Sequence, residues 1–419
     1  MTEGEAILRV AAKGDGVTAS GRFVAGAAPG DMVLADGLLV AGPQHATPVC
    51  RHYGVCGGCQ LQHLDDPALA VFVAERVVYA ALGQGLVAER VAPPQLSPPG
   101  SRRRAVLHAA AAAGRVELGY REAASHRLVD LTECPVLVPQ LAMLIAPLRR
   151  MLARQAQGAP PNKAQAKAKG KPKAAARFAA DIELALADQG ADVAIRGLPV
   201  EGLAATELLL DFARDNGLAR LTLDQGYGPE ALWEPEPVTI TLSGVAVALP
   251  PGGFLQATAD GEAALTAATT QWLAGCGAVA DLFSGLGTFA FALAAQGSRV
   301  LAVEAERRLH LACKAAAGKA QLTVHALHRD LFRNPLQAGE LARFDAVLLD
   351  PPRAGARDQV VRLAGSAVSR VVYISCNPAS WARDAMTLID GGFRLVELRP
   401  VGQFRWSTHV ELASLFVRD

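Results

Sequence analysis

The sequence lacks the features that mark membrane, secreted and disordered chains. Aromatic residues make up only 5% and charged residues 19% of its 419 positions, while hydrophobic residues reach 51%. This globular profile excludes a fibrous or disordered class. Residues 1–5 carry acid where a signal peptide carries base, and no apolar stretch of sufficient length follows them. We therefore expect a cytoplasmic protein without a membrane partner.

The sequence also lacks a large net charge and an even number of cysteines. The formal net charge is +1, so no global basic field indicates a nucleic-acid partner, and any phosphate contact must come from local clusters. Seven cysteines form an odd set, and without an export signal they do not predict disulfides. The length predicts two or three domains, and we expect a monomer.

Residues 1–47 alternate short valine and leucine runs with turn sequences at 14–16, 28–31 and 41–43. This spacing is typical of an all-β unit, and we predict a small OB-like β-barrel. Such barrels bind oligonucleotides or serve as scaffolds. Phe23 is the only Phe, Tyr or Trp in this stretch, which disfavours direct base stacking.

Residues 48–245 are predicted to form a central α+β domain with a basic low-complexity insertion at about 154–177. No acidic residue occurs from 151 to 180. A solvated loop is the default interpretation, because this composition cannot bury enough apolar surface to fold alone. Contact with RNA phosphates is the second interpretation. The lysines of the insertion are Lys163, Lys167, Lys169, Lys171 and Lys173.

Residues 246–419 change to units of strand, turn and helix. Helix-like alanine and leucine stretches separate five short apolar runs, at 278–283, 299–304, 322–327, 344–349 and 370–374. This alternation predicts an α/β fold with a doubly wound, mainly parallel, Rossmann-like sheet. Ligands of such sheets bind outside the carboxyl ends of the strands.

The first of these runs leads into a glycine loop that contains Asp281, Phe283, Gly285 and Gly287. Its glycines let the backbone approach a ligand and turn into a helix. A dinucleotide fingerprint needs a third glycine at a fixed spacing, which is absent here. The loop therefore favours a nucleoside ligand over a pyrophosphate.

Acidic residues follow the next two runs. Glu304 ends the second run, where an acid can accept hydrogen bonds from ribose hydroxyls, and Asp330 follows the third, where an acid can accept one from an adenine amino group. Each acid alone is more often a helix cap or a surface charge. Together with the glycine loop they predict S-adenosylmethionine as the cofactor.

The fourth and fifth runs end in Asp350-Pro351-Pro352-Arg353 and in Cys376. Two prolines make a rigid rim that can present Asp350 to the edge of a planar base. Arg353 stands where amino-group methyltransferases have an aromatic residue, so methylation of an exocyclic nitrogen is disfavoured. Cys376 alone would most simply be a buried thiol.

Covalent chemistry on uracil connects Cys376 with a late glutamate. Uracil C5 is a poor nucleophile until a thiolate adds at C6, and a base must later remove the C5 proton. Cys376 is the candidate nucleophile. Glu411 is the candidate base, although a strand glutamate that faces solvent is an equally simple interpretation of that residue alone.

Three cysteines, Cys50, Cys56 and Cys59, are clustered, and Cys134-Pro135 follows far along the chain. Four thiolates can bind zinc or an iron–sulfur cluster. Zinc sites usually pair two close ligands with two more, so the spacing favours a [4Fe–4S] cluster. We interpret Cys276 and Cys313 as buried thiols.

Together these motifs resemble the RNA 5-methyluridine methyltransferases over almost the whole chain. The resemblance implies that residues 1–47 are a TRAM barrel, that Cys50, Cys56, Cys59 and Cys134 bind a [4Fe–4S] cluster, and that the substrate is 23S rRNA. It also implies the following roles. The cofactor residues are Gln256, in Phe254-Leu255-Gln256, with Asp281, Phe283, Gly285, Gly287, Glu304, Asp330 and Asp350; the target-base residues are Asp350, Pro351 and Arg353; the RNA-contacting residues are Arg102, Arg103 and Arg104; the nucleophile is Cys376 and the base Glu411.

Two motifs depart from the family pattern. Thr258 stands where the family usually has asparagine, and Gly402-Gln403-Phe404-Arg405 replaces a segment that commonly carries aspartate and proline. The same chemistry on tRNA is the first alternative; the barrel and the cysteines weigh against it, because the tRNA members commonly lack them. A non-catalytic RNA-binding or chaperone protein is the second, although it would need neither nucleophile nor base.

Overall fold

The computed structural model describes residues 4–112, 115–158 and 178–419. The five lysines of the predicted insertion lie outside this range, whereas its first residues, 154–158, end helix α3 (Ile145–Gly158). None of the helices in the described ranges is long and apolar enough to cross a membrane.

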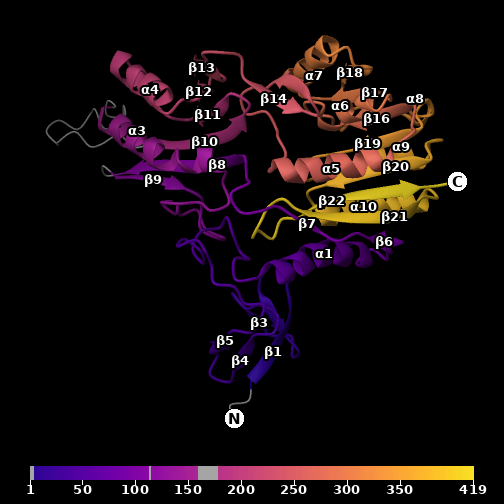
Figure 1. Cartoon of the computed structure of the whole chain (residues 1–419), viewed down its shortest axis with the longest axis horizontal. Helices are drawn as coiled ribbons and strands as arrows, with labels where there is room; N and C mark the ends of the chain where they lie inside the picture. The colour runs from indigo at the N-terminus through magenta and orange to yellow at the C-terminus, as the bar shows by residue number, and fades with distance from the viewer. Residues whose placement is uncertain (1–3, 113–114, 159–177) are drawn as a thin grey trace.

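The N-terminal unit is a sheet of five short strands at one end of the molecule (Figure 1). Its order is β3-β2-β1-β4-β5, packed around Ile7, Ala27 and Val33. The expected all-β unit is thus present. The pairings found among the described residues run from β3 to β5 and do not join these two edges. The strands are β1 (Gly4–Val10), β2 (Gly16–Thr18), β3 (Phe23–Val24), β4 (Met32–Leu34) and β5 (Leu39–Val40).

The central unit is a six-stranded sheet of order β13-β12-β11-β10-β8-β9. Side chains alternate along β10, so that Ile182 and Leu184 enter a core shared with α3 and α4. This period-two pattern is that of a strand with one buried face. The elements are β8 (Arg104–Ala112), β9 (Arg115–Gly119), α2 (Pro139–Ala142), α3, β10 (Phe178–Ala187), β11 (Gly190–Arg196), α4 (Leu203–Asp215), β12 (Arg220–Asp224) and β13 (Glu230–Trp233).

The C-terminal sheet has the order β18-β17-β16-β19-β20-β22-β21-β6, with β7 also paired to β21. Strands β16 to β20 are parallel, and β22 runs antiparallel between β20 and β21. The predicted strands are confirmed. The five predicted strands are β16 (Ala278–Leu282), β17 (Arg299–Glu304), β18 (Val324–His328), β19 (Ala346–Leu349) and β20 (Arg370–Ser375). The sheet also contains β21 (Arg394–Gly402) and β22 (Glu411–Val417).

Helices cover both faces of this sheet and bury two separate cores (Figure 1). Leu265, Phe289 and Ala312 from α5, α6 and α7 pack on one face. Helices α1, α8, α9 and α10 pack on the other. The helices are α1 (Asp66–Leu82), α5 (Ala259–Trp272), α6 (Thr288–Ala295), α7 (Arg307–Lys319), α8 (Ala338–Leu341), α9 (Arg357–Ala364) and α10 (Pro378–Asp390).

Two segments of the predicted central domain, 48–245, pack with the C-terminal sheet instead. Helix α1 lies against α10 and β21, and β6 (Arg90–Val91) and β7 (Gln95–Leu96) extend the sheet beyond β21. The hairpin of β14 (Thr239–Leu242) and β15 (Val245–Ala248) crosses the expected boundary at 245 and adds to the core on the opposite face, with α5, α6 and α7. The N-terminal half of the chain therefore helps to build the C-terminal unit.

Candidate active site

The predicted nucleophile and base lie on neighbouring strands. Cys376 follows the last residue of β20, and Glu411 is the first residue of β22. The antiparallel register pairs Ser375 with Leu412, so the next pair along the ladder brings Cys376 beside Glu411. Cys376 is partly exposed, whereas Glu411 is only 3% exposed. A reachable thiol thus lies next to a carboxyl that is shielded from water.

A hydrogen-bonded chain of side chains connects Glu411 with the Asp-Pro-Pro turn. Gln403 Nε2 donates to Glu411 Oε2 (2.8 Å) and to Gln256 Oε1 (2.9 Å). Gln256 Nε2 in turn donates to Asp350 Oδ2 (3.4 Å), and Ala257 N donates to Gln403 Oε1 (3.1 Å). Gln403 belongs to the segment that departs from the family pattern, and the sequence alone gave no role for it.

The local environment raises the pKa of three side chains of this site, Glu411, Asp350 and Cys376. Burial, with a contribution from the Asp350 carboxylate, raises the pKa of Glu411 to about 8, and the hydrogen bond from Gln403 opposes this rise. Desolvation raises the pKa of Asp350 to about 7. Burial and the nearby Glu411 and Asp350 raise the pKa of Cys376 to about 11, which Arg353 partly offsets. Clustered shifts of this size are typical of catalytic sites.

The glycine loop after β16 has the backbone that its sequence predicts. Gly287 adopts φ 94° at the start of α6, and a Cβ there would lie 2.8 Å from the Phe291 ring and 2.9 Å from Cys313 Sγ. Gly285 adopts φ 54° and faces open space. Phe283 has φ 65°, a conformation that a bulky residue adopts only under constraint. The loop is thus tightly fixed and open on one side.

Several polar groups lie around this loop. Glu304 accepts hydrogen bonds from Gly285 N (2.9 Å) and Glu306 N (2.6 Å), which orients its carboxylate. Both carboxylate oxygens of Asp281 and the Ser284 hydroxyl are buried and have no hydrogen-bond partner among the described residues. Burial and the charge of Asp350 raise the pKa of Asp281 well above its usual value. Unpaired buried carboxylates are costly, so this site suits a cationic or hydrogen-bonding ligand.

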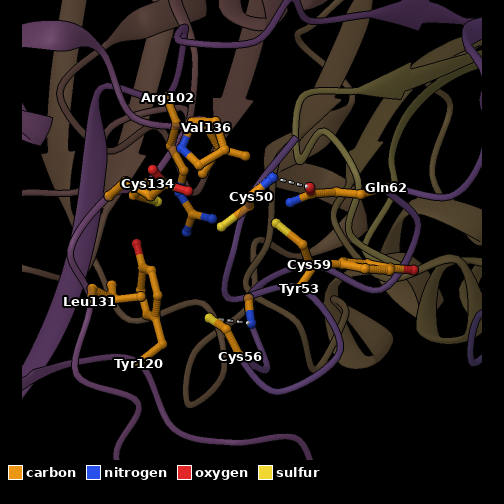
Figure 2. A pocket seen from close by; sticks show the side chains of 13 residues that line it. Cys50, Tyr53, Cys56, Cys59, Gln62, Arg102, Tyr120, Leu131, Cys134 and Val136 are labelled. Atoms are coloured by element: carbon orange, nitrogen blue, oxygen red, sulfur yellow. Dashed lines mark hydrogen bonds between the residues drawn. The ribbon is translucent and has the colours of Figure 1, made fainter. Parts of the chain in front are cut away.

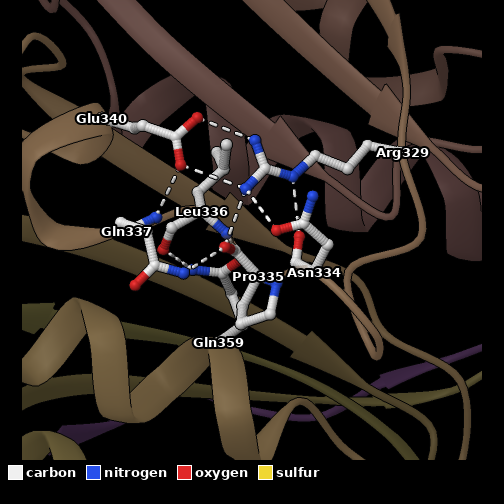
Figure 3. Close-up of polar contacts among 7 residues, drawn as sticks. All are labelled: Arg329, Asn334, Pro335, Leu336, Gln337, Glu340 and Gln359. Carbon is white, nitrogen blue, oxygen red and sulfur yellow. Dashed lines mark hydrogen bonds and ion pairs between the residues drawn. The ribbon is translucent and has the colours of Figure 1, made fainter.

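Hydrogen bonds from Arg329 hold the segment that follows Asp330 (Figure 3). Arg329 donates to Asn334 O (2.7 Å), Pro335 O (2.8 Å) and Glu340 Oε1 (2.7 Å). Asp330 accepts from Phe332 N (2.9 Å) and Arg333 N (3.3 Å) in a turn that begins no helix, and its role as a ligand stays a prediction. The half-exposed Phe332 ring lies 5.4 Å from that of Phe283. Phe332 was not singled out from the sequence.

A cluster of cationic side chains surrounds His409 near the target-base turn. Arg353 Nη2 lies 3.3 Å from His409 Nδ1, and Arg102 stacks 5.8 Å from the centre of the Phe404 ring. Burial and the charges of Arg353, Arg102 and Arg76 lower the pKa of His409. None of these three arginines has a carboxylate within 4.0 Å in the described parts of the chain. Their positive charge is therefore available to an anionic partner.

The other two arginines of the predicted basic segment differ in accessibility. Arg103 is 8% exposed, pairs with Glu262 (2.5 Å) and donates to Gln256 O (3.2 Å). Its guanidinium therefore braces the Gln256 motif and does not face solvent. Arg104 is partly exposed and stacks 4.9 Å from the centre of the Phe254 ring.

The four predicted metal-binding cysteines line a single cavity (Figure 2). Cys50, Cys56 and Cys59 come from one loop, and Cys134 comes from the segment before α2. Tyr120 and Arg102 also line the cavity. No three Cys, His, Asp or Glu side chains converge tightly enough to hold a single metal ion anywhere in the described ranges. The four thiols thus line one cavity, but they do not converge on a single metal-ion position.

Comparison with known proteins identifies relatives of this chain. The model of the tRNA (uracil-5-)-methyltransferase family matches residues 263–419. An uncharacterized RNA methyltransferase of Zymomonas mobilis is 46% identical over 98% of this chain and 99% of its own length. The 23S rRNA (uracil(1939)-C(5))-methyltransferase RlmD of Edwardsiella ictaluri is 35% identical over 89% of this chain and 82% of its own.

A solved structure shows the same fold. The Pyrococcus abyssi tRNA (uracil-54, C5)-methyltransferase in complex with S-adenosyl-L-homocysteine has a TM-score of 0.73 at 22% identity, and the match covers 99% of this chain and 100% of that one. The fold and site thus define a class I methyltransferase. The chain belongs to the family of RNA (uracil-C5-)-methyltransferases, which confirms the resemblance found in its motifs.

Proposed function

We propose that this enzyme methylates C5 of a specific uridine in structured RNA, with S-adenosylmethionine as donor, Cys376 as nucleophile and Glu411 as base. One observation carries the proposal. A reachable thiol and a water-shielded carboxyl lie side by side on β20 and β22, beside the turn that holds Asp350. The chemistry needs this pair of groups on one target base.

The residues around the glycine loop fit the cofactor. The unpartnered Asp281 carboxylate and Ser284 hydroxyl supply acceptors and a donor, and the open side of Gly285 leaves space for the ligand. Glu304 suits the ribose hydroxyls, Asp330 the adenine amino group, and Gln256 and Asp350 the methionine end. The bound cofactor supplies an electrophilic methyl group on a sulfonium.

The reaction divides into three steps at Cys376 and Glu411. The Cys376 thiol, whose pKa is raised to about 11, first loses its proton to solvent. The resulting thiolate adds to C6 of the uracil, which places the electron pair at C5 as an enolate. C5 then takes the methyl group and becomes tetrahedral. Glu411 finally removes the C5 proton, and the C6–S bond breaks to return the thiolate and the aromatic 5-methyluracil. A carboxyl whose pKa is about 8 is a stronger base than an ordinary glutamate, which suits this proton.

The base must leave its stack to reach Cys376. Asp350, Pro351 and Arg353 form the rim for its polar edge. Arg102, Arg353 and the neighbouring Arg76 offer uncompensated positive charge to the flanking phosphates, and Phe404 offers a stacking face. We keep Arg104 as an RNA contact and assign Arg103 to support of the Gln256 motif.

We favour 23S rRNA over tRNA as the substrate. The support is the 35% identity to RlmD, a protein named for this activity, over most of both chains. The likeness to the tRNA enzyme of Pyrococcus abyssi is one of fold alone at 22% identity. The N-terminal sheet would act as the TRAM-like RNA-binding barrel.

We further propose that Cys50, Cys56, Cys59 and Cys134 hold a [4Fe–4S] cluster. A four-iron cluster takes one thiolate on each iron. Its ligands therefore need not converge on one point, which is how the four thiols are arranged here. The cluster would supply a rigid crosslink between the loop of the first three cysteines and the segment of Cys134.

The test uses RNA from a strain that lacks this protein, with labelled cofactor. Cys376→Ala should abolish methyl transfer yet bind S-adenosylhomocysteine as the unmodified enzyme does. Glu411→Gln should instead accumulate a covalent RNA adduct that survives denaturing gels. Methyl transfer by Cys376→Ala would refute covalent catalysis, and product release by Glu411→Gln at the normal rate would refute the assignment of the base. Transfer to tRNA and not to 23S rRNA would overturn the substrate preference.

A further inference from the structure

The loop of the first three cysteines runs directly beside the loop that leads to Glu411. Gln60 N and Leu61 N both donate to Trp406 O, at 2.8 Å and 2.9 Å. Thr408 N donates to the Gln60 side-chain oxygen at 3.3 Å. Gln60 directly follows Cys59, so a proposed cluster ligand is joined through one residue to the base loop, which comprises residues 402–410.

Gln60 is itself fixed from within the cysteine loop. Its Nε2 donates to Gly57 O (2.6 Å), and the Tyr53 hydroxyl donates to Gln60 O (2.9 Å). Tyr53 and Gly57 lie between Cys50 and Cys59. Because Gln60 is anchored at its side chain and its carbonyl, it can transmit the position of the cysteine loop to the residues that it contacts.

The base loop needs such support because its backbone is strained. Trp406 has φ 59° and is 6% exposed. A large side chain in the left-handed region persists only where the surroundings over-determine it. The two N–H groups on its carbonyl provide that restraint. Gln403, which orients Glu411, precedes Trp406 in the same loop.

A second connection runs from Cys134 to the same place. Arg102 N donates to Val136 O (2.9 Å), and Arg103 N donates to Ala257 O (2.9 Å). Ala257 N then donates to Gln403 Oε1 (3.1 Å). Hydrogen bonds thus join one side of the cysteine cavity to the backbone of the base loop and the other side to the Gln403 side chain, which holds Glu411.

From these contacts we infer that Gln60 is a positioning residue for Glu411, through which the cysteine loop sets the geometry of proton removal. The inference rests on the proposed role of Glu411 as the base. It assigns the cysteine site a part in the last chemical step, where C5 loses its proton, and none in cofactor binding or in attack by Cys376.

The deciding variant is Gln60→Met, which keeps the length of the side chain but removes the acceptor for Thr408 N. The substitution also removes the donation from Gln60 Nε2 to Gly57 O. Loss of these two hydrogen bonds should slow product release about tenfold, while cofactor affinity and the rate of adduct formation stay unchanged. The covalent adduct should therefore accumulate under turnover. Hydrogen exchange of the amides in residues 404–410 should be faster in the free variant.

Two further variants make the test specific. Gln60→Glu keeps an oxygen for Thr408 N but loses the donation to Gly57 O, so its adduct level should lie between those of the unmodified enzyme and Gln60→Met. Gln271→Met changes an exposed glutamine of α5 that contacts Arg399 and should behave as the unmodified enzyme. A normal adduct level in Gln60→Met, or parallel losses of cofactor binding and adduct formation, would overturn the inference. So would a Gln60→Glu variant as defective as Gln60→Met. If Glu411→Gln traps no adduct, the proposed function itself has failed.

Discussion

Burial of Glu411 should make the protein less stable as the pH rises, and Glu411→Gln should remove this effect. The pKa of Glu411 in the folded protein is about 8, against an ordinary value of 4.5. Between these values the folded state binds more protons than the unfolded state, so the free energy of unfolding falls with rising pH. Below about pH 4.5 the carboxyl is neutral in both states and the effect disappears.

The size of the effect follows from the shift. A change from 4.5 to about 8 corresponds to about 5 kcal/mol at full development. Water entry and relaxation around the charge reduce this value, and Gln403 can still donate to a glutamine at this position. We expect Glu411→Gln to be more stable than the unmodified protein by about 2–4 kcal/mol at pH 9 and equally stable at pH 4.5.

Urea unfolding followed by tryptophan fluorescence across this pH range measures the difference. Three of the four tryptophans, Trp272, Trp381 and Trp406, pack with the C-terminal sheet and report on the unit that holds Glu411. Glu397 on β21 is a matched control whose pKa shifts in the opposite direction. Burial alone would raise the pKa of Glu397, but hydrogen bonds from Arg399 and Trp272 outweigh burial and lower it. Glu397→Gln should therefore be destabilising at neutral pH. Parallel stability curves for the unmodified protein and Glu411→Gln would refute the reasoning.

Three further predictions follow from the site. Gly287→Ala should lower the free energy of unfolding in urea by about 2–4 kcal/mol, because the added Cβ would lie 2.8 Å from Phe291. Gly285→Ala should lower it by less, because a Cβ at Gly285 would face open space. Equal losses in the two variants would contradict this packing argument. Asp281→Asn should stabilise the ligand-free protein at pH values above the ordinary pKa of aspartate, since a buried unpaired carboxylate is costly without its ligand. The same variant should bind S-adenosylhomocysteine more weakly in calorimetry. Unchanged affinity would show that Asp281 does not face the cofactor. Cys59→Ser should lose the iron and the brown colour of anaerobically purified protein, whereas Cys276→Ser should keep both; a colourless, iron-free and fully folded unmodified protein would count against the cluster.

The sequence by itself determined the fold class of the C-terminal unit and indicated the residues that we propose as the reacting groups. Five apolar runs with polar residues at their ends are enough to predict a parallel sheet and its ligand edge, because strand period and strand-end chemistry are local properties. The order of the motifs then identified the family. Cys376, Glu411 and the Asp350 turn can all be picked out from their residue types and their positions at the ends of the strands.

Only the tertiary structure decided which side chains connect these groups. Gln403 holds Glu411 and Gln256 together, yet its residue type and position carry no local signal, because its role depends on partners far apart in the chain. Burial reassigned Arg103 from a presumed RNA contact to a support of Gln256. The packing of α1, β6 and β7 on the C-terminal unit was likewise invisible to a linear division into domains. Contacts between residues far apart in the sequence depend on the whole fold. The sequence therefore indicates which residues can carry the chemistry, whereas the tertiary structure decides which side chains surround and orient them.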